Sequence, residues 1–188
     1  MITQIRNNKQ LKDYCHDVIE DAGVSVTVDS SLGMDDYVGI KVDEYYQNNT
    51  KGDNCPKAVD FIVPVDCVNN AYVLYILELK GGKNKNYTTE NIYEKFDTAI
   101  NDFVKNRFKN IFYADKYKYK EIFLYLVSEY PPEAMKYGNY GEYQRIREKL
   151  KTKDTLYRDA EFSRPYEMRG KLYRIKREIP PNPIICRK

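Results

Sequence analysis

The sequence predicts a single α/β domain with a central mixed β-sheet flanked by helices. The chain has 188 residues, which suits one domain with its own hydrophobic core. Apolar runs typical of strands alternate with stretches of helical periodicity, in the order helix, helix, strand hairpin, helix, strand and helix. No linker or internal repeat divides the chain, so all of these elements are expected to belong to one domain.

The beginning of the chain predicts two helices separated by a short strand. Residues 24–28, VSVTV, have the alternation of a short strand. Residues 35–49 repeat apolar side chains at helical spacing, although Gly39 is unfavourable inside a helix. Residues 7–23 place five apolar side chains on one helical stripe, namely Leu11, Tyr14, Cys15, Val18 and Ile19.

A β-hairpin is predicted in the middle of the chain. Residues 57–66, KAVDFIVPVD, and residues 71–80, AYVLYILELK, form two apolar runs. Residues 67–70, CVNN, have the composition of the turn between them. Pro64 lacks a backbone N–H and therefore indicates a bulge or an edge position in the first strand.

The strongest helical pattern follows at residues 88–108. Thr88 or Thr89 supplies its N-cap, and apolar side chains recur along one face. Residues 121–128, EIFLYLVS, are continuously apolar, which is typical of a central strand buried on both faces. The remaining predicted elements are a helix at residues 141–151 and a strand or sheet edge at residues 170–179.

Several classes of protein are not expected from this sequence. No apolar run is long enough to span a membrane, and the N-terminus lacks the apolar stretch of a signal peptide. We therefore expect a cytoplasmic, intracellular protein whose four cysteines are reduced. The cysteines include no C-x-x-C pair and His16 is the single His, so no structural zinc site is expected.

Charge is distributed unevenly along the chain. Residues 1–53 contain five Lys or Arg against ten Asp or Glu, whereas residues 54–188 contain 26 against 18. Much of the positive charge lies in the C-terminal part, residues 129–188, where residues 142–177 have a net charge of +6. This pattern favours a surface that binds a polyanion, and the alternative is a solvated surface of mixed charge.

Two charged residues end the second arm of the predicted hairpin. Strand side chains alternate, so Glu78 and Lys80 face one side of the sheet while Leu77 and Leu79 face the other. Asp60 interrupts the apolar run of the first arm and, if the arms pair, approaches Glu78 across the strands. Two carboxylates at this distance repel each other and are costly to bury, so positive charge is expected between them.

A divalent cation would supply that charge. Mg²⁺ prefers oxygen ligands and needs only one or two carboxylates, because it keeps several waters, and Mn²⁺ is expected to substitute for it. With Mg²⁺ at Asp60 and Glu78, Lys80 can orient or help to deprotonate a water, or stabilise charge on a phosphate. These parts make a site that hydrolyses phosphodiesters. The alternative is a salt bridge from Lys80 to Glu78 or Asp60 at a solvated end of the sheet.

The spacing of these residues resembles the motif of the PD-(D/E)XK nuclease superfamily. Asp60, a gap of 17 residues and the tripeptide ELK at residues 78–80 carry the resemblance. It covers about residues 36–128, the expected catalytic core, in which the order of helix, hairpin, helix and strand also matches. Val59 stands where the motif has Pro.

This resemblance implies a restriction-endonuclease-like core and a role for each residue of the motif. Asp60 and Glu78 would be metal ligands and Lys80 the catalytic lysine. The superfamily often adds an acidic residue from an upstream helix, for which Glu44 is the candidate and Asp43 the alternate. An exposed acid on the surface of the helix is an equally good interpretation of Glu44, and the sequence leaves both open.

Basic residues near the motif suit a DNA substrate. The loop that follows Lys80 contains glycines, which allow close approach to phosphates, although a surface turn without this role fits the sequence equally well. The C-terminal part is rich in Arg, which can bind guanine bidentately in the major groove. The candidates for contact with double-stranded DNA are Lys83, Lys85, Arg145, Arg147, Arg169 and Arg174.

Together these features predict a Mg²⁺-dependent endodeoxyribonuclease. The resemblance indicates a small type II restriction endonuclease that acts as a homodimer, because two active sites cut the two strands of a symmetric site. One alternative is a structure-specific nuclease of repair, recombination or phage origin. The other is a non-catalytic nucleic-acid-binding or protein-interaction module on the same fold.

Overall fold

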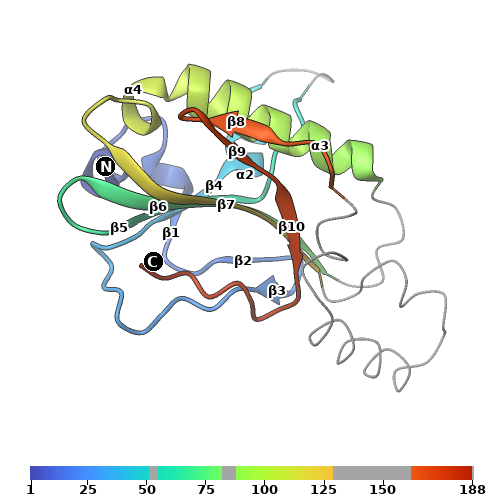
Figure 1. Ribbon diagram of the computed structural model, residues 1–188, viewed down its shortest axis with the longest axis horizontal. Helices are drawn as coiled ribbons and strands as arrows, with labels where there is room; N and C mark the ends of the chain where they lie inside the picture. The colour runs from blue at the N-terminus through green and yellow to red at the C-terminus, as the bar shows by residue number, and fades with distance from the viewer. Residues whose placement is uncertain (51–54, 82–87, 129–161, 188) are drawn as a thin grey trace.

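The computed structural model of the protein describes residues 1–50, 55–81, 88–128 and 162–187. These residues form one α/β domain around a mixed six-stranded sheet with the strand order β1-β4-β5-β6-β7-β10 (Figure 1). The predicted fold class, a central mixed sheet flanked by helices, is confirmed. The strands of this sheet are β1 (Cys15–His16), β4 (Gly39–Lys41), β5 (Phe61–Asp66), β6 (Ala71–Lys80), β7 (Lys118–Ser128) and β10 (Ile175–Glu178).

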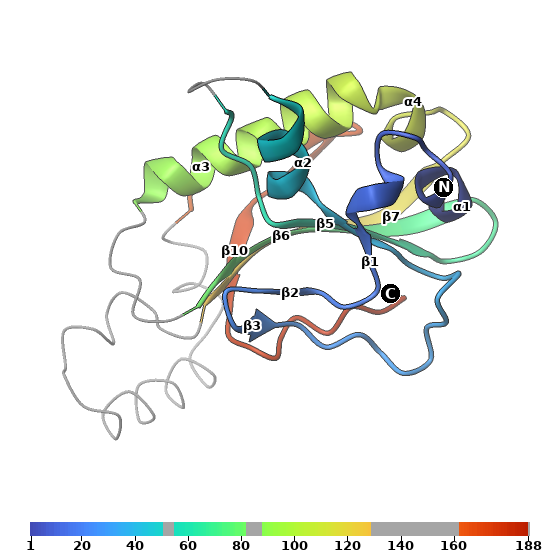
Figure 2. The ribbon, with the colours of Figure 1, turned by 180° about the vertical axis from the view of Figure 1, so that it is seen from behind.

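Helices cover one face of the sheet (Figures 1 and 2). Their apolar side chains form one hydrophobic cluster with alternate residues of β6, among them Leu74 and Ile76. Among the described residues, no helix is long and apolar enough to cross a membrane. The helices are α1 (Ile2–Arg6), α2 (Val42–Asn49), α3 (Thr89–Asp97) with a π-helical continuation (Thr98–Arg107), and α4 (Lys109–Phe112).

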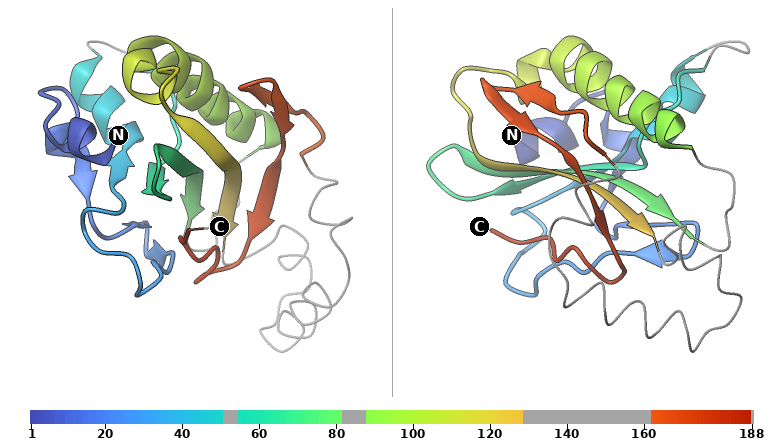
Figure 3. Two further views of the ribbon diagram at one scale, coloured as in Figure 1. Left: turned by 60° about the vertical axis from the view of Figure 1, so that its left-hand side comes forward. Right: turned by 45° about the vertical axis from the view of Figure 1, so that its right-hand side comes forward.

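Extended segments cover the opposite face. A small hairpin, β2 (Glu20–Asp21) and β3 (Val24–Ser25), lies below the sheet in Figure 3. The C-terminal segment lies on the same side, where the backbone N–H of Ile185 donates to the carbonyl of Thr27 at 2.8 Å. The other alternate residues of β6 are buried there, so β6 has apolar layers on both faces. This double burial explains why its sequence is apolar almost to its end.

The predicted hairpin is confirmed. β5 and β6 pair in antiparallel orientation, with Phe61 opposite Leu77. Pro64 lies inside β5, but β4 pairs only with Phe61 and Ile62 of that strand, so the missing N–H of Pro64 interrupts no pairing with β4. The turn residues Val68, Asn69 and Asn70 all have positive φ, a conformation that Asn tolerates well.

Helix α3 connects β6 to a parallel neighbour, β7. The side chain of Thr88 accepts a hydrogen bond from the backbone N–H of Asn91, which confirms Thr88 as the N-cap. β7 lies between β6 and β10 and is parallel to both, so the prediction of a central strand at residues 121–128 is also confirmed. β10 forms the edge of the sheet, within the predicted strand at residues 170–179. The C-terminal region also contains the small hairpin β8 (Tyr166–Met168) and β9 (Lys171–Tyr173), and the predicted helix at residues 141–151 lies outside the described residues.

The predicted helix at residues 7–23 is wrong. This segment contains a single 3₁₀ turn, Lys12–Tyr14, followed by β1 and β2. Leu11 and Ile19, which the helical period placed on one stripe, are buried on opposite faces of the sheet. A single short helix cannot bury both, and the chain instead passes from one face to the other.

The predicted helix at residues 35–49 is correct only from Val42 onward. Gly39 lies in β4, opposite His16 of β1. A Cβ atom at Gly39 would overlap the end of the Ile19 side chain and lie 3.1 Å from the carbonyl oxygen of His16. The absence of a side chain at Gly39 therefore allows two extended segments to pack closely, and the helix begins after Gly39. The strand predicted at residues 24–28 is limited to β3.

The β2–β3 hairpin packs against the end of β6. Its turn residues, Ala22 and Gly23, have φ values of 50° and 75°. Gly81 directly follows Lys80, and a Cβ atom there would overlap the carbonyl oxygen of Ala22. Gly81 thus allows the hairpin turn to lie against the backbone beside Lys80.

Replacing Gly81 with Ala is expected to destabilise the protein by about 1–3 kcal/mol, because the hairpin or the end of β6 must shift to make room. Urea denaturation measures this change. Gly33→Ala is the matched control, since its Cβ atom would meet only Asp36 Oδ2 at 3.6 Å, an ordinary contact. Equal free energies of unfolding for the two variants would show that the close approach to Gly81 contributes nothing to stability.

Candidate active site

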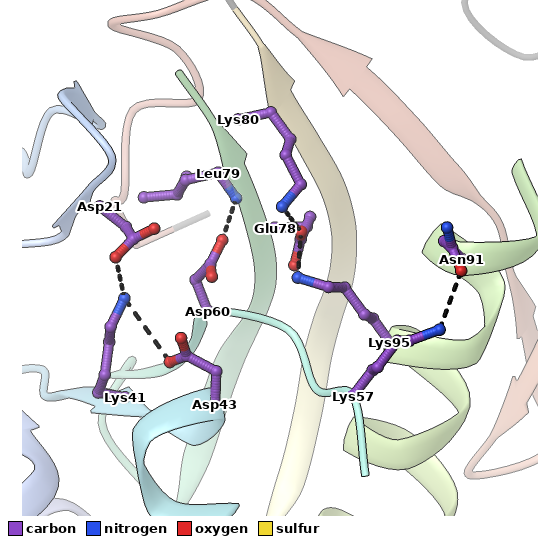
Figure 4. Close-up of polar contacts among 10 residues, drawn as sticks. All are labelled: Asp21, Lys41, Asp43, Lys57, Asp60, Glu78, Leu79, Lys80, Asn91 and Lys95. Atoms are coloured by element: carbon purple, nitrogen blue, oxygen red, sulfur yellow. Dashed lines mark hydrogen bonds and ion pairs between the residues drawn. The ribbon is translucent and has the colours of Figure 1, made fainter. Parts of the chain in front are cut away.

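Asp60 and Glu78 lie opposite each other at one end of β5 and β6. The register that pairs Phe61 with Leu77 places Asp60, the residue before β5, across from Glu78. Figure 4 shows the two carboxylates with Lys80 beside them and helix α3 on the far side of Glu78. The structure thus brings together the three residues of the sequence motif.

Asp60 is held by backbone contacts and is only 3% exposed. Its Oδ2 accepts a hydrogen bond of 2.6 Å from the backbone N–H of Leu79. Its carbonyl oxygen accepts one of 2.9 Å from the backbone N–H of Val42, which ties the start of α2 to this point. Burial, and then the negative charge of Glu78, raise the pKa of Asp60 to about 8. At neutral pH, Asp60 therefore retains a proton unless a cation compensates its charge.

Glu78 is fully buried and contacts two lysines through one oxygen. Its Oε1 lies 2.6 Å from Nζ of Lys80 and 2.6 Å from Nζ of Lys95, which lies on α3. Its Oε2 is buried and has no hydrogen-bond partner among the described residues. A buried carboxylate oxygen without a partner is costly. A cation at Oε2 would remove this cost.

The charge state of Lys80 limits what it can do. Burial lowers the pKa of Lys80, but the charge of Glu78 and the hydrogen bond to it raise the pKa more, so it lies above its usual value. Lys80 is therefore an ammonium ion in this site. Of its expected roles, stabilising a phosphate and orienting a water suit the ammonium form, whereas accepting a proton from water does not.

A second group of charges lies beside Asp60. Lys41, at the end of β4, forms an ion pair with Asp21 of the β2–β3 hairpin. Its Nζ also lies 3.6 Å from Oδ1 of Asp43, in the first turn of α2, which is beyond hydrogen-bonding distance. Oδ1 of Asp43 has no hydrogen-bond partner within the described part of the chain, and burial raises the pKa of this carboxyl.

Of the two upstream acids considered from the sequence, Asp43 has contacts in this group. As far as the structure describes the chain, the ion pairs around Lys41 include Asp43 and not Glu44. Glu44 is the next residue of α2, and one residue along a helix turns the side chain by about 100°. Since α2 begins only at Val42, Asp43 lies in its first turn, next to the backbone contact between Val42 and Asp60.

Sequence reasoning missed Lys95. The helical period does contain a signal for it, because Lys95 lies three residues after Ile92 and four before Ala99, both fully buried. A lysine in such a position has its side chain directed toward the sheet. A charged residue on an apolar stripe, downstream of a strand that ends in Glu and Lys, is the pattern that would have identified it.

The described candidates for DNA contact differ in their surroundings. The guanidinium of Arg169 donates to the carbonyl of Ala114 at 3.0 Å and lies over the ring of Tyr113. Ala114 precedes β7, whose beginning is at the opposite end of the sheet from Glu78, so Arg169 lies far from the two carboxylates. Arg174 is exposed between β9 and β10. The other four candidates, Lys83, Lys85, Arg145 and Arg147, lie outside the described residues.

The acids at this end of the sheet suit a hard divalent cation. Oε2 of Glu78 and Oδ1 of Asp43 are buried carboxylate oxygens without hydrogen-bond partners in the described part of the chain, and such oxygens are the ligands that Mg²⁺ prefers. In the ranges that the structure describes, no three His, Cys, Asp or Glu side chains are grouped so as to hold a metal ion. A cation at Asp60 and Glu78 would therefore take its remaining ligands from water or substrate, as Mg²⁺ usually does.

Comparison with known proteins found no matching family model, no matching curated protein and no matching solved structure.

Proposed function

We propose that the protein is a Mg²⁺-dependent endonuclease that hydrolyses the phosphodiester bonds of double-stranded DNA. The observation that supports this most is the facing pair of buried acids, Asp60 and Glu78, with the ammonium of Lys80 within 2.6 Å of Glu78. Oε2 of Glu78 lacks a hydrogen-bond partner among the described residues, and a cation would compensate it. The order of antiparallel hairpin, helix and parallel strand around the pair is also the order that the resemblance to PD-(D/E)XK nucleases implies.

Each residue of the site has a role in this proposal. Asp60 and Glu78 would hold the cation, which would lower the pKa of a water and neutralise charge on phosphate oxygens. Lys80, kept in place by its ion pair with Glu78, orients the attacking water and stabilises the negative charge that develops on the phosphate. Asp43 lies beside Asp60 in Figure 4 and would contribute a ligand through a water, while the ammonium of Lys41, 3.6 Å from its Oδ1, partly compensates its negative charge.

The finer assignment that we propose is a type II restriction endonuclease acting as a homodimer. A symmetric duplex presents two equivalent strands, and two copies related by a two-fold axis place one active site on each. The basic C-terminal part of the sequence supplies charge for contacts with the phosphate backbone.

Incubation of the purified protein with mixed-sequence plasmid DNA and Mg²⁺, followed by sequencing of the fragment ends, tests the proposal. Discrete ends with one shared sequence support restriction, whereas preferential cutting of branched or flapped DNA supports a structure-specific nuclease. Cutting of RNA in place of DNA would change the substrate class. No cutting, together with no binding of Mg²⁺ or Mn²⁺, would favour a non-catalytic module.

Mn²⁺ is expected to raise the melting temperature of the protein by about 5–10 °C at 100 times its dissociation constant. Binding to the native state alone contributes roughly 2.7 kcal/mol at that concentration, and each kcal/mol shifts the midpoint by about 2–4 °C in a chain of this size. Thermal unfolding in Mn²⁺ and in EDTA measures the shift. Asp60→Asn should lose the shift and Asp29→Asn, at a partly buried aspartate outside this site, should retain it, so an equal shift in both variants contradicts binding at Asp60.

A further inference from the structure

Two lysines from different elements meet at one oxygen of Glu78. Lys80 comes from the end of β6 and Lys95 from the middle of α3, and both ammonium groups lie 2.6 Å from Oε1 (Figure 4). They are therefore neighbours, and two like charges repel at such a separation. Glu78 is the carboxylate that holds them together.

This pair of lysines has capacity to bind a further anion. One carboxylate carries a single negative charge, whereas the two ammonium groups carry two positive charges. Each ammonium has three N–H donors, and Glu78 Oε1 takes one from each. The side chains of Lys80 and Lys95 are 20% and 19% exposed, so both reach solvent.

Resting on the proposed function, we propose that Lys95 is a second phosphate-binding lysine, which binds a non-bridging oxygen of the phosphodiester together with Lys80. A phosphodiester has two such oxygens that share one negative charge. Two ammonium groups approaching from β6 and from α3 match them in charge and in number of donors. Glu78 then has two tasks, because one oxygen is available to a cation and the other positions the lysines.

A purely structural role for Lys95 makes different predictions. If Lys95 only neutralised Glu78, its removal would still leave Lys80 on Oε1, and saturating metal would neutralise the carboxylate in its place. Activity would then return to the wild-type rate at high metal concentration. If Lys95 binds the phosphate, no concentration of metal restores the lost contact.

The test compares Lys95→Met and Lys95→Arg with the control Lys57→Met. Lys57 also contacts α3, through Glu94 Oε2 at 2.8 Å and Asn91 Oδ1 at 3.1 Å, but its side chain is 52% exposed and lies away from Glu78. Three quantities are measured for each protein: Mn²⁺ affinity by electron paramagnetic resonance, plasmid cleavage at saturating Mn²⁺, and the affinity for a mixed-sequence DNA duplex in Ca²⁺ at several salt concentrations. Circular dichroism establishes that each variant is folded.

Lys95→Met is expected to bind Mn²⁺ at least as tightly as the wild type, because one repelling positive charge is gone. Its cleavage rate at saturating Mn²⁺ should fall about 100-fold, the scale of loss for one group that stabilises charge in the transition state. The slope of log affinity against log salt should decrease by about 0.9, the contribution of one phosphate contact. Lys95→Arg should recover most of the slope, and Lys57→Met should match the wild type throughout.

Wild-type cleavage and an unchanged salt slope in Lys95→Met would overturn this role while leaving the proposed function intact. Failure of the proposed function has another signature, because the wild type itself would then neither bind Mn²⁺ nor bind DNA.

Discussion

Asp60→Asn is expected to abolish metal-dependent cleavage and to make the folded protein more stable at alkaline pH. The loss of activity should be at least about 1,000-fold, or roughly 4 kcal/mol of transition-state stabilisation, because an amide cannot replace a carboxylate as a ligand of Mg²⁺. The gain in stability follows from the burial of Asp60. A mutation that removes activity by damaging the fold would lower stability, so the two results together identify a functional residue.

The gain in stability of Asp60→Asn should increase with pH, and the raised pKa of Asp60 determines this sign. In the unfolded chain Asp60 has an ordinary pKa near 4, whereas in the folded protein burial and the charge of Glu78 raise its pKa to about 8. Between these values the folded state binds the proton more tightly, so the contribution of Asp60 to stability is complete below pH 4. It is lost progressively as the pH rises from about 4 to about 8, with a slope of up to about 1.4 kcal/mol per pH unit.

Urea denaturation in EDTA at pH 5, 7 and 9 measures this effect. The difference in the free energy of unfolding between Asp60→Asn and the wild type should grow by roughly 4 kcal/mol, in favour of Asn, between pH 5 and pH 9. Asp29→Asn is the control, because Asp29 is only partly buried and its hydrogen bonds with Ser31 lower its pKa, which places its titration below this range. A constant difference between Asp60→Asn and the wild type from pH 5 to pH 9 would refute the raised pKa.

The hairpin that carries this site could be predicted because its signals are local. Alternation along residues 71–80 determines that Glu78 and Lys80 share a face, and the turn at residues 67–70 determines the register. Once the register is known, Asp60 can only lie opposite Glu78. No information from distant parts of the chain is required for this step.

The N-terminal region could not be predicted in the same way, because its structure depends on distant partners. Leu11 and Ile19 fit a helical stripe, yet they fill hydrophobic clusters on opposite faces of the sheet. Placing the start of α2 too early has a direct consequence for the site. A helix that begins at Val42 puts Asp43 in its first turn beside Asp60, and this start depends on the pairing of β4 with β1 and β5.

The contact of Lys95 with Glu78 could not be predicted either, because it also depends on a distant part of the chain. The periodicity of residues 88–108 is sufficient to predict a helix, and it also predicts that the side chain of Lys95 points toward the sheet. Its partner is a carboxylate on a different element, however, and only the crossover from β6 through α3 to β7 brings the two together. Contacts of this kind require the packing of the helix on the sheet.

Glu78→Gln is expected to destabilise the protein by about 2–4 kcal/mol, in contrast to Asp60→Asn. Gln keeps the shape of the side chain but removes the one negative charge among the described residues that forms ion pairs with both Lys80 and Lys95. Breaking a buried ion pair by removing one partner costs roughly 3–5 kcal/mol, and the partial exposure of both lysines reduces that cost here. Glu94→Gln is the matched control, because its ion pair with Lys57 is more than half exposed and such pairs contribute about 0–1 kcal/mol.

A double variant separates the repulsion between the lysines from other effects of Glu78→Gln. Adding Lys95→Met removes one of the two ammonium groups, so part of the lost stability should return. In a double-mutant cycle at pH 7, the coupling between positions 78 and 95 should be at least about 1 kcal/mol. Additive losses, or a Glu78→Gln variant no less stable than Glu94→Gln, would mean that Glu78 does not hold the two lysines together. Glu78 could then not position both ammonium groups with one oxygen while the other oxygen binds a metal ion, because this double role requires both lysines to be bound to Glu78.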